Sequence, residues 1–275
     1  MTTLVVGAGG TIGGGLVSAL SRGGKAVEST TRATLDLADA PESWTLPAPA
    51  DTAFVCAAIG AMGRCADEPQ ATHRVNVEHT VQLAKRLVEA GSFVVFPSTD
   101  KVFDGSRPLR RADDPPSPHS EYGRQKAEAE ARLLQLGESV AILRVTKVVP
   151  ACTQLLAGWA HALRAGEPIQ PFSDMVMAPV SLQLTTDVLC RIAVDRISGI
   201  TQLSAARDIT LEAAARHLCT RLGADPALVH PASARQAPLP EGSTPAHTSL
   251  DMSRLRSLGW TAPDPFDAID TVLPR

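Results

Sequence analysis

Two short polar stretches, residues 97–105 and 122–126, carry side chains whose types and spacing suit proton transfer. Tyr122 is the only tyrosine of the chain, and Lys126 follows it four residues later. On a helix the phenol and the ammonium would share one face, about one turn apart. A phenol ordinarily titrates at about pH 10, and a neighbouring ammonium favours the phenolate and lowers that pKa. A tyrosine tuned in this way can exchange a proton with a carbonyl or alcohol oxygen.

Two hydroxyls, those of Ser98 and Thr99, come directly after the apolar run at residues 93–96. Such a run is typical of a buried strand, so both residues would lie where a strand ends. In an open α/β sheet the carboxyl ends of the strands form the edge at which ligands bind. A hydroxyl beside the tyrosine could hold the same substrate oxygen in place.

Near the amino terminus, a β-branched run at residues 3–6 is followed by Gly7, Gly10 and Gly13 and then by a helical pattern. The order strand, glycine turn, helix is that of a dinucleotide-binding fingerprint. Gly7 would permit the tight turn, Gly10 would let the backbone approach a pyrophosphate, and Gly13 would let the helix pack on the strand. The amides at the start of that helix would then face the phosphates.

The end of the second expected strand, residues 26–30, bears on the choice of cofactor. It leads into Thr31 and Arg32, where an NAD site usually has Asp or Glu for the ribose 2′-hydroxyl. Hydroxyls and a guanidinium suit a 2′-phosphate instead, because Arg binds phosphate through a bidentate fork. The pattern favours NADP over NAD, while Glu28 is a rival acidic residue and a solvated surface role is the competing interpretation of Arg32.

Strand-like and helical patterns alternate along residues 1–150, and the pattern then changes to helices with irregular stretches. Helices are expected over residues 68–89, 122–136, 154–165, 186–193 (capped near Thr185) and 210–222. We therefore predict an α/β protein with a doubly wound parallel sheet of the Rossmann type, formed by residues 1–150. Residues 151–275 would form a smaller, mainly helical lobe that is interwoven with the first and binds the substrate.

Composition and charge exclude several classes of function. The chain has 275 residues and a net charge of -3, which gives no reason to expect binding to nucleic acid or to a bilayer. Its five cysteines and seven histidines lack metal-ligand spacing, so we expect free thiols in a reducing cytoplasm and no metal site. No basic leader and no run of about 18 apolar residues is present, which predicts a cytoplasmic protein without a membrane span.

The sequence Ser-Thr-Asp-Lys-Val-Phe-Asp-Gly at residues 98–105 resembles the Ser-Thr-Asp-Tyr-Val-Phe-Asp-Gly signature of dTDP-4-dehydrorhamnose reductase-like (RmlD-like) proteins, which bind sugar nucleotides. These proteins belong to the extended branch of the short-chain dehydrogenase/reductase superfamily. Residues 7–13 have the glycine spacing that resembles that branch. The resemblance implies that Thr99, Tyr122 and Lys126 are the catalytic residues. It also implies an NADPH-dependent reductase of a keto group on a sugar nucleotide or a related small molecule.

The expected cofactor contacts combine the motif residues with positions that the resemblance implies. They are Gly7, Gly10, Thr11, Ile12, Gly13, Thr31, Arg32, Asp36, Leu37, Ala57, Ala58, Asn76, Ser98, Tyr122 and Lys126. Asp36 resembles an adenine-contacting residue of the family and could equally be a turn aspartate. Asn76 corresponds to an asparagine that supports a proton relay behind the lysine in relatives, and an ordinary packing role is as good an interpretation.

The expected substrate contacts are Lys101, Phe103 and Val148. Lys101 departs from the family signature, which has tyrosine there, so its ammonium could contact a substrate phosphate or carboxylate, or lie on the surface without a role. Residues 148–150 replace an aromatic pair and a glycine of the relatives, which indicates a different pocket wall.

Two alternatives to the reductase stay open at this point. The same family includes the regulatory β-subunit of methionine adenosyltransferase, so a non-catalytic NADP-binding subunit is one of them. The other is a sugar-nucleotide epimerase or dehydratase that uses the same three residues with tightly held NAD. In the leading interpretation the partner is a nucleotide sugar, with a homodimer as an option.

Overall fold

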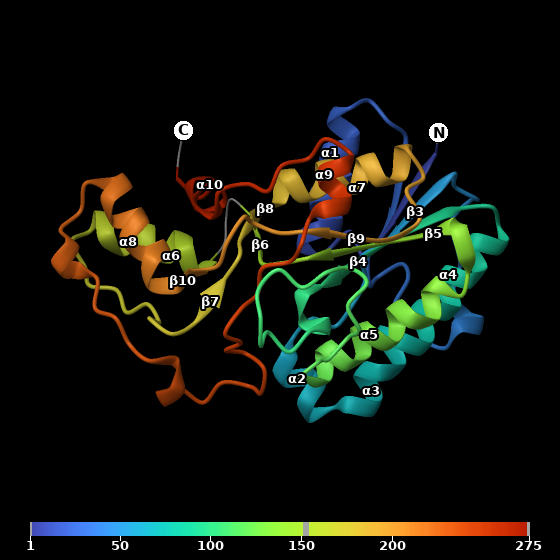
Figure 1. Ribbon diagram of the computed structural model, residues 1–275. Helices are drawn as coiled ribbons and strands as arrows, with labels where there is room; N and C mark the ends of the chain where they lie inside the picture. The colour runs from blue at the N-terminus through green and yellow to red at the C-terminus, as the bar shows by residue number, and fades with distance from the viewer. Residues whose placement is uncertain (1, 151–153, 274–275) are drawn as a thin grey trace. The chain divides into compact units, whose positions relative to one another are not determined.

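The computed structural model describes residues 2–150 and 154–273 (Figure 1). Cys152, one of the expected free thiols, lies outside these residues. The other four cysteines are free thiols, as predicted: Cys56, Cys65, Cys190 and Cys219.

The secondary structure alternates between strand and helix through the first half of the chain. The strands are β1 (Thr3–Val6), β2 (Val27–Thr30), β3 (Thr52–Val55), β4 (Phe93–Thr99), β5 (Val140–Val145), β6 (Val148–Val149), β7 (Val176–Met177), β8 (Val180–Ser181), β9 (Gly199–Leu203) and β10 (Ile209–Thr210). The α-helices are α1 (Thr11–Arg22), α2 (Met62–Asp67), α3 (Pro69–His73), α4 (Thr80–Glu89), α5 (Glu121–Leu134), α6 (Gln154–Arg164), α7 (Leu182–Val194), α8 (Leu211–Leu222), α9 (Ser253–Ser257) and α10 (Pro265–Asp270). A π-helical turn, η2 (Arg74–His79), joins α3 to α4. The 3₁₀ turns are η1 (Pro41–Ser43), η3 (Asp100–Val102), η4 (Gly137–Ser139), η5 (Pro226–Leu228) and η6 (Ala234–Gln236).

The main sheet has six strands in the order β2-β1-β3-β4-β5-β9, which confirms the predicted doubly wound α/β fold. The pairings that join β2, β1, β3, β4 and β5 are all parallel. The chain runs from β1 outward to β2 and then returns to place β3 on the other side of β1. The strand order therefore reverses between β1 and β3, and ligands of such sheets bind at the carboxyl ends of the strands that flank this point.

Helices cover both faces of this sheet, with α1 and α7 on one face and α4 and α5 on the other (Figure 1). Alternate residues of a strand point to opposite faces. Val94 and Phe96 of β4 thus pack in one hydrophobic cluster with Leu83 of α4 and Leu133 of α5. Both strand residues are fully buried, so this cluster fixes α5 against β4.

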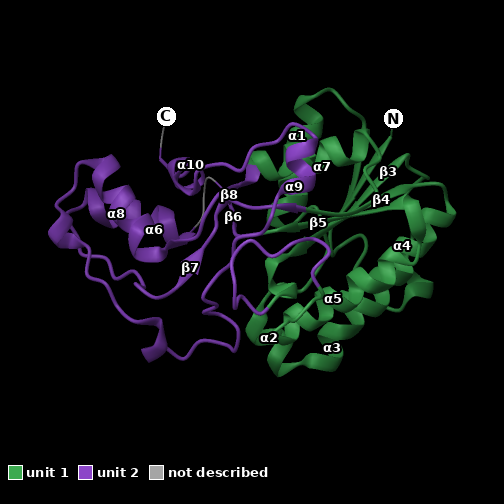
Figure 2. Cartoon of the chain, in the orientation of Figure 1, with its two compact units in different colours: residues 1–103, 115–145, 183–201 green, residues 104–114, 146–182, 202–275 purple. Residues whose placement is uncertain are grey.

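The chain forms two compact units, each made of separate segments (Figure 2). Unit 1 comprises residues 1–103, 115–145 and 183–201, and unit 2 comprises residues 104–114, 146–182 and 202–275. Unit 2 has a hydrophobic core of its own, in which Trp159 and Leu163 of α6 pack with Ala214 and Leu218 of α8. Residues 104–114, which the predicted division near residue 150 assigned to the first domain, belong to unit 2, and residues 183–201, which it assigned to the second lobe, belong to unit 1.

Two helices differ from their predicted form. The predicted helix over residues 68–89 is interrupted by η2, where the Thr80 hydroxyl donates a 2.8 Å hydrogen bond to the Val75 carbonyl five residues back. The helix expected to begin near Thr185 begins at Leu182. Inside it the Thr186 hydroxyl donates to the Gln183 carbonyl at 2.8 Å, so threonine satisfies a carbonyl within the helix and does not cap its end.

Strand β9 was not predicted, because its five residues include a glycine and two polar residues and show no strong apolar run. In the described part of the chain, no helix is both long and apolar enough to cross a membrane. The same residues include no group of three or more His, Cys, Asp or Glu side chains placed to hold a metal ion.

Candidate active site

The turn between β1 and α1 brings the backbone close to the end of β3. Gly7 has a φ of +86°, and a Cβ atom there would lie 2.6 Å from the Ala57 backbone nitrogen, so only glycine fits without a shift. A Cβ on Gly13, in the first turn of α1, would collide with the Gly7 carbonyl oxygen. Helix α1 has no side-chain cap at Gly10 and no acidic residue in its first turn. Its first amides are therefore available to an anion, as the glycine pattern predicted.

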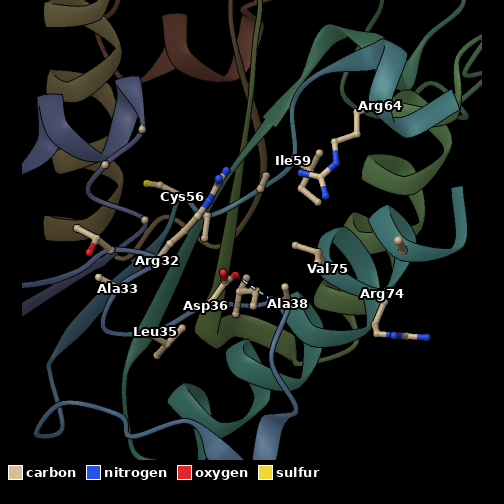
Figure 3. A pocket seen from close by; sticks show the side chains of 18 residues that line it. Arg32, Ala33, Leu35, Asp36, Ala38, Cys56, Ile59, Arg64, Arg74 and Val75 are labelled. Atoms are coloured by element: carbon tan, nitrogen blue, oxygen red, sulfur yellow. Dashed lines mark hydrogen bonds between the residues drawn. The ribbon is translucent and has the colours of Figure 1, made fainter. Parts of the chain in front are cut away.

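A cavity of about 790 Å³ lies beside this turn, and all the residues that line it belong to unit 1 (Figure 3). Eight of the predicted cofactor contacts line it: Gly7, Gly10, Thr31, Arg32, Asp36, Leu37, Ala57 and Ala58. Three more, Thr11, Ile12 and Gly13, form the first turn of α1. The cavity thus occupies the carboxyl edge of β1, β2 and β3, where the strand order predicts a ligand.

The charge of the cavity lining is positive. Arg32, Arg64 and Arg74 line it together with one acidic residue, Asp36. The Asp36 carboxylate accepts a 2.9 Å hydrogen bond from the Ala38 amide, which is the turn role that was the alternative interpretation of this residue. An excess of guanidinium groups over carboxylates in the lining suits a ligand that carries phosphate groups.

Several residues of the cavity were not predicted, notably Cys56, Arg64, Arg74 and Val75. Arg64 lies on a helix of six residues that has too little periodicity to be recognised. Its position beside the cavity depends on how the chain folds back after β3.

Asn76 lies in the π-helical turn η2, and its amide group fixes the wall of the cavity. Its Oδ1 atom accepts from the Ile59 amide at 2.8 Å, while its Nδ2 atom donates to the Ile59 carbonyl at 3.0 Å and to Gln125 Oε1 at 2.8 Å. These bonds tie the loop after β3 to α5. A direct contact between Asn76 and a cofactor stays a prediction.

The two hydroxyls at the end of β4 have different surroundings. The Thr99 hydroxyl donates to Asp100 Oδ1 at 3.1 Å and accepts from the Lys101 amide at 3.2 Å, so it caps the turn η3. The buried Ser98 hydroxyl has no hydrogen-bond partner among the described residues. Ser98 follows Phe96 by two residues in the strand, so both side chains point to the same face, which α5 covers. An unpaired buried hydroxyl at this edge is a ready contact for a ligand.

Lys126 of α5 is buried against the end of β4, with 2% of its surface exposed. Its Nζ atom donates to the Pro97 carbonyl at 2.8 Å and lies 3.6 Å from the centre of the Phe96 ring. Burial lowers the pKa of Lys126 from 10.5 to about 7, and the Glu130 carboxylate opposes this shift. Burial also raises the pKa of Cys56, which lines the cavity, to about 12, and the Lys126 ammonium opposes that shift. The amine thus lies close enough to the cavity to influence its thiol.

Tyr122 lies in the first turn of α5, which packs directly on the turn after β4. The Ser120 hydroxyl caps this helix by accepting from the Gly123 amide at 3.2 Å. A Cβ atom on Gly123 would collide with the Lys101 carbonyl oxygen, so glycine at this position allows the close contact. The first turn of α5, which carries the phenol, is thereby held beside the segment that contains Thr99.

Burial raises the pKa of Tyr122 above its usual value, and the Asp100 carboxylate raises it further. This direction is opposite to the predicted lowering by Lys126. The physical reason is that the phenol itself is desolvated and has a carboxylate nearby, while an amine with a pKa of about 7 is only partly charged at neutral pH. A raised pKa keeps the phenol protonated, which is the form that donates a proton to a carbonyl oxygen.

A buried ion pair joins the helix that carries Lys126 to β5. Glu130 follows Lys126 by one turn, and its Oε2 atom lies 2.7 Å from Nη2 of Arg144 in β5. Each side chain is 2% exposed. The Arg144 guanidinium also lies 5.0 Å from the centre of the Phe103 ring. The carboxylate is thus neutralised by Arg144 while it raises the pKa of the neighbouring amine.

The three predicted substrate contacts fall in different surroundings. Lys101 Nζ lies 3.6 Å from Asp100 Oδ2, so its ammonium already has an acidic partner at the end of β4. Phe103 is buried and packs against Arg144. Val148 belongs to unit 2, where β6 pairs with β8. Lys101 and Phe103, by contrast, belong to the unit that contains Tyr122 and Lys126.

Unit 1 therefore combines two features that an NADP-dependent reductase needs. The glycine turn and the arginines fit the phosphates of a dinucleotide, and the unpaired Ser98 hydroxyl and the Lys126 amine fit polar groups further along the sheet edge. A protonated phenol, the form that the raised pKa of Tyr122 favours, is chemically able to act as a general acid.

Comparison with known proteins identifies the family. The family model described as "RmlD substrate binding domain" matches residues 1–273. The dTDP-4-dehydrorhamnose reductase of Streptomyces griseus is 30% identical over 267 residues, which cover 93% of this chain and 87% of that protein. The methionine adenosyltransferase 2 subunit beta of Bos taurus is 37% identical over 79 residues, and the chain matches only 24% of its length.

The fold has close counterparts among solved structures. The dTDP-4-dehydrorhamnose reductase of Bacillus anthracis str. Ames, solved in complex with NADP, has a TM-score of 0.86 at 17% sequence identity. The match covers 98% of this chain and 97% of that chain. Because the family model spans nearly the whole sequence and includes the motifs at residues 7–13, 98–105 and 122–126, the chain belongs to the RmlD substrate binding domain family.

Proposed function

We propose that this protein is an NADPH-dependent reductase of a keto group on a sugar nucleotide or a related small molecule. The observation that carries the proposal is the buried Lys126 amine, held on the Pro97 carbonyl one helical turn from the only tyrosine of the chain. Burial of an amine is costly, and side chains with strongly shifted pKa values cluster at functional sites. The phosphate-compatible cavity at the same sheet edge supports the choice of a dinucleotide enzyme.

The proposed catalytic residues have distinct roles in the reaction. Bound NADPH would supply a hydride to the ketone carbon. Tyr122 donates its proton to the ketone oxygen, and its raised pKa keeps the phenol protonated before the reaction. The Thr99 hydroxyl, with Ser98 as the alternative, orients the same oxygen. Lys126 holds the nicotinamide ribose and compensates the charge that develops on the phenol.

The preference for NADPH rests on the cavity lining. Arg32 follows the end of β2, where it would meet a 2′-phosphate, and it has no hydrogen-bond or ion-pair partner within residues 2–150 and 154–273. The sole acidic residue of the lining, Asp36, is engaged with the Ala38 amide. The Bacillus anthracis relative was solved with NADP, which agrees with this choice. NAD is the alternative.

The substrate class follows from the relatives that match over most of the chain. The Streptomyces griseus relative is named for dTDP-4-dehydrorhamnose, a keto sugar attached to a nucleotide. We include Lys101 and Phe103 of unit 1 in the proposed substrate site, and a substrate contact of Val148 stays a prediction. Because Lys101 replaces the tyrosine of the family signature, we propose that the preferred sugar differs from that of relatives with tyrosine.

The test is NADPH oxidation with a panel of keto-sugar nucleotides, followed by absorbance. In the Tyr122→Phe variant we expect turnover to fall by about 10²–10⁴-fold, which is the usual contribution of a general acid. The affinity for NADPH, measured by fluorescence titration, should not change, because the phenylalanine ring keeps the shape of the site. Undiminished turnover in this variant would refute the role of Tyr122.

The same experiment separates the alternatives. No oxidation with any substrate of the panel, together with a partner protein that co-purifies, would favour a regulatory subunit. Cofactor that stays bound through purification and is not consumed would favour an epimerase or dehydratase. A cytoplasmic location is part of our proposal, supported by the four free cysteines, and a homodimer is tested by light scattering during size-exclusion chromatography.

A further inference from the structure

The cavity contains two guanidinium groups that approach from opposite sides. Arg32 extends into it from the segment after β2, and Arg64 extends into it from α2 (Figure 3). Arg74 also lines the cavity, but its guanidinium points away from the space between the other two. Two like charges that face each other across a cavity repel, and an anion bound between them offsets this repulsion.

The hydrogen-bond partners of Arg64 leave most of its donors available. Its Nε atom donates to Glu68 Oε2 at 3.2 Å, in a pair whose side chains are 48% and 52% exposed. Exposed pairs one helical turn apart are weakly held, so this contact does not fix the guanidinium. The two terminal nitrogens have no partner within residues 2–150 and 154–273. A planar group with two parallel free N–H bonds matches the geometry of a phosphate.

The neighbours of Arg64 strengthen this assignment. The loop from Ala57 to Ile59 lies in the same lining and packs against the glycine turn at Gly7. Asn76 holds that loop through both backbone atoms of Ile59. Arg64 therefore stands beside a rigid wall, at the edge of the sheet where the phosphates of a dinucleotide are expected.

We propose that Arg64 is a second phosphate-binding residue of this cavity and that, together with Arg32, it holds one phosphate group of the dinucleotide. The inference rests on the proposed dinucleotide function and assigns a role to a residue that the glycine motif and the catalytic motifs do not include. Because Arg32 is proposed to meet the 2′-phosphate, we expect the same group between the two guanidinium groups, and the pyrophosphate is the alternative that the experiment distinguishes.

The experiment compares three variants of the full chain with the unchanged protein: Arg64→Gln, Arg64→Lys and Arg132→Gln. Arg132 is the matched control, because it also forms an exposed pair one turn away, with Glu128, and does not line the cavity. Dissociation constants for NADPH and NADH are measured by fluorescence titration at one fixed salt concentration. Thermal unfolding of each variant checks that the fold is intact.

We expect Arg64→Gln to weaken NADPH binding by about tenfold, which is the usual loss for one charge-assisted hydrogen bond. Arg64→Lys should recover part of the affinity, because it keeps the charge but loses the planar fork. Arg132→Gln should bind like the unchanged protein. A loss restricted to NADPH identifies the 2′-phosphate as the ligand of Arg64, and an equal loss for NADPH and NADH identifies the pyrophosphate.

Two results would overturn the inference, and they differ in what else they affect. If Arg64→Gln binds both dinucleotides as tightly as Arg132→Gln does, Arg64 has no part in phosphate binding while the proposed function survives. If the unchanged protein binds neither dinucleotide, both the inference and the proposed function fail.

Discussion

Lys126 offers the most direct test of the electrostatics of this site. The side chain is 2% exposed, and burial lowers its pKa from 10.5 to about 7. The folded protein therefore holds the ammonium less readily than the unfolded chain does. We predict that Lys126→Met removes this unfavourable contribution and that the benefit depends on pH in a defined way.

The sign of the effect follows from the two pKa values. Below pH 7 the amine is charged in both states, and the folded protein bears the full cost of burying the ammonium. Between pH 7 and pH 10.5 the folded protein releases the proton while the unfolded chain keeps it, so the stability of the unchanged protein rises with pH. Above pH 10.5 both states are neutral and the cost disappears.

The magnitude is large enough to measure. A pKa difference of one corresponds to ~1.4 kcal/mol. The cost is therefore about 4 kcal/mol at pH 7 and about 2 kcal/mol at pH 9. The hydrogen bond to the Pro97 carbonyl, worth about 1 kcal/mol, is lost in the variant at both pH values and shifts the comparison by a similar amount at each. The change between the two pH values, about 2 kcal/mol, is therefore the quantity to test.

The assay is urea unfolding of the unchanged protein and of Lys126→Met at several pH values from about 7 to about 9. Lys85→Met is the control, because the Lys85 side chain is 64% exposed and its substitution should change stability equally at every pH. The advantage of Lys126→Met over the unchanged protein should shrink steadily as the pH rises. A difference that stays constant over this range would show that the folded protein does not depress the pKa of Lys126, and the electrostatic reasoning would be refuted.

Two further predictions concern packing around the same helix. Gly123→Ala should lower both stability and turnover, because the added Cβ collides with the Lys101 carbonyl and displaces the turn that carries Tyr122. In α6, Gly158→Ala should instead stabilise the protein by about 1 kcal/mol, since nothing lies within 4 Å of the Cβ position. Thermal unfolding of the two variants measures the contrast. Glu130→Gln should lower the free energy of unfolding by about 3–5 kcal/mol in urea, because it removes one charge of the buried pair with Arg144. Glu89→Gln, which removes an exposed pair with Lys85, should change stability by less than about 1 kcal/mol. Equal effects of the two variants would contradict the role of burial.

Much of the fold could be predicted because its signals are local. The apolar run at residues 3–6 matches β1 residue for residue, since a short β-branched stretch before a glycine turn has few other conformations. The spacing of Tyr122 and Lys126 places them one turn apart on α5, whatever the rest of the chain does. The glycine pattern likewise predicted the tight turn at Gly7, where φ is +86°, and the close packing of α1 at Gly13.

Other features had no local signal. The periodicity of apolar residues does not reveal the π-helical turn at residues 74–79 or the early start of α7, and it does not reveal the threonine hydroxyls that bond to carbonyls in both places. The division of the chain into two units depends on which segments pack together after long excursions along the sequence. Arg64 joins the cavity only because the chain turns back beside β3.

The sequence by itself determined which chemical groups are present and which of them share a strand end or a helix face, because covalent spacing and backbone periodicity settle those relations. Tertiary structure alone decided how acidic those groups are. The pKa values of Tyr122 and Lys126 depend on burial, on Asp100 and on Glu130, and those surroundings exist only once α5 packs on β4. Desolvation and charge act through space over a few ångströms, so the direction of each shift follows from packing and not from the order of residues along the chain.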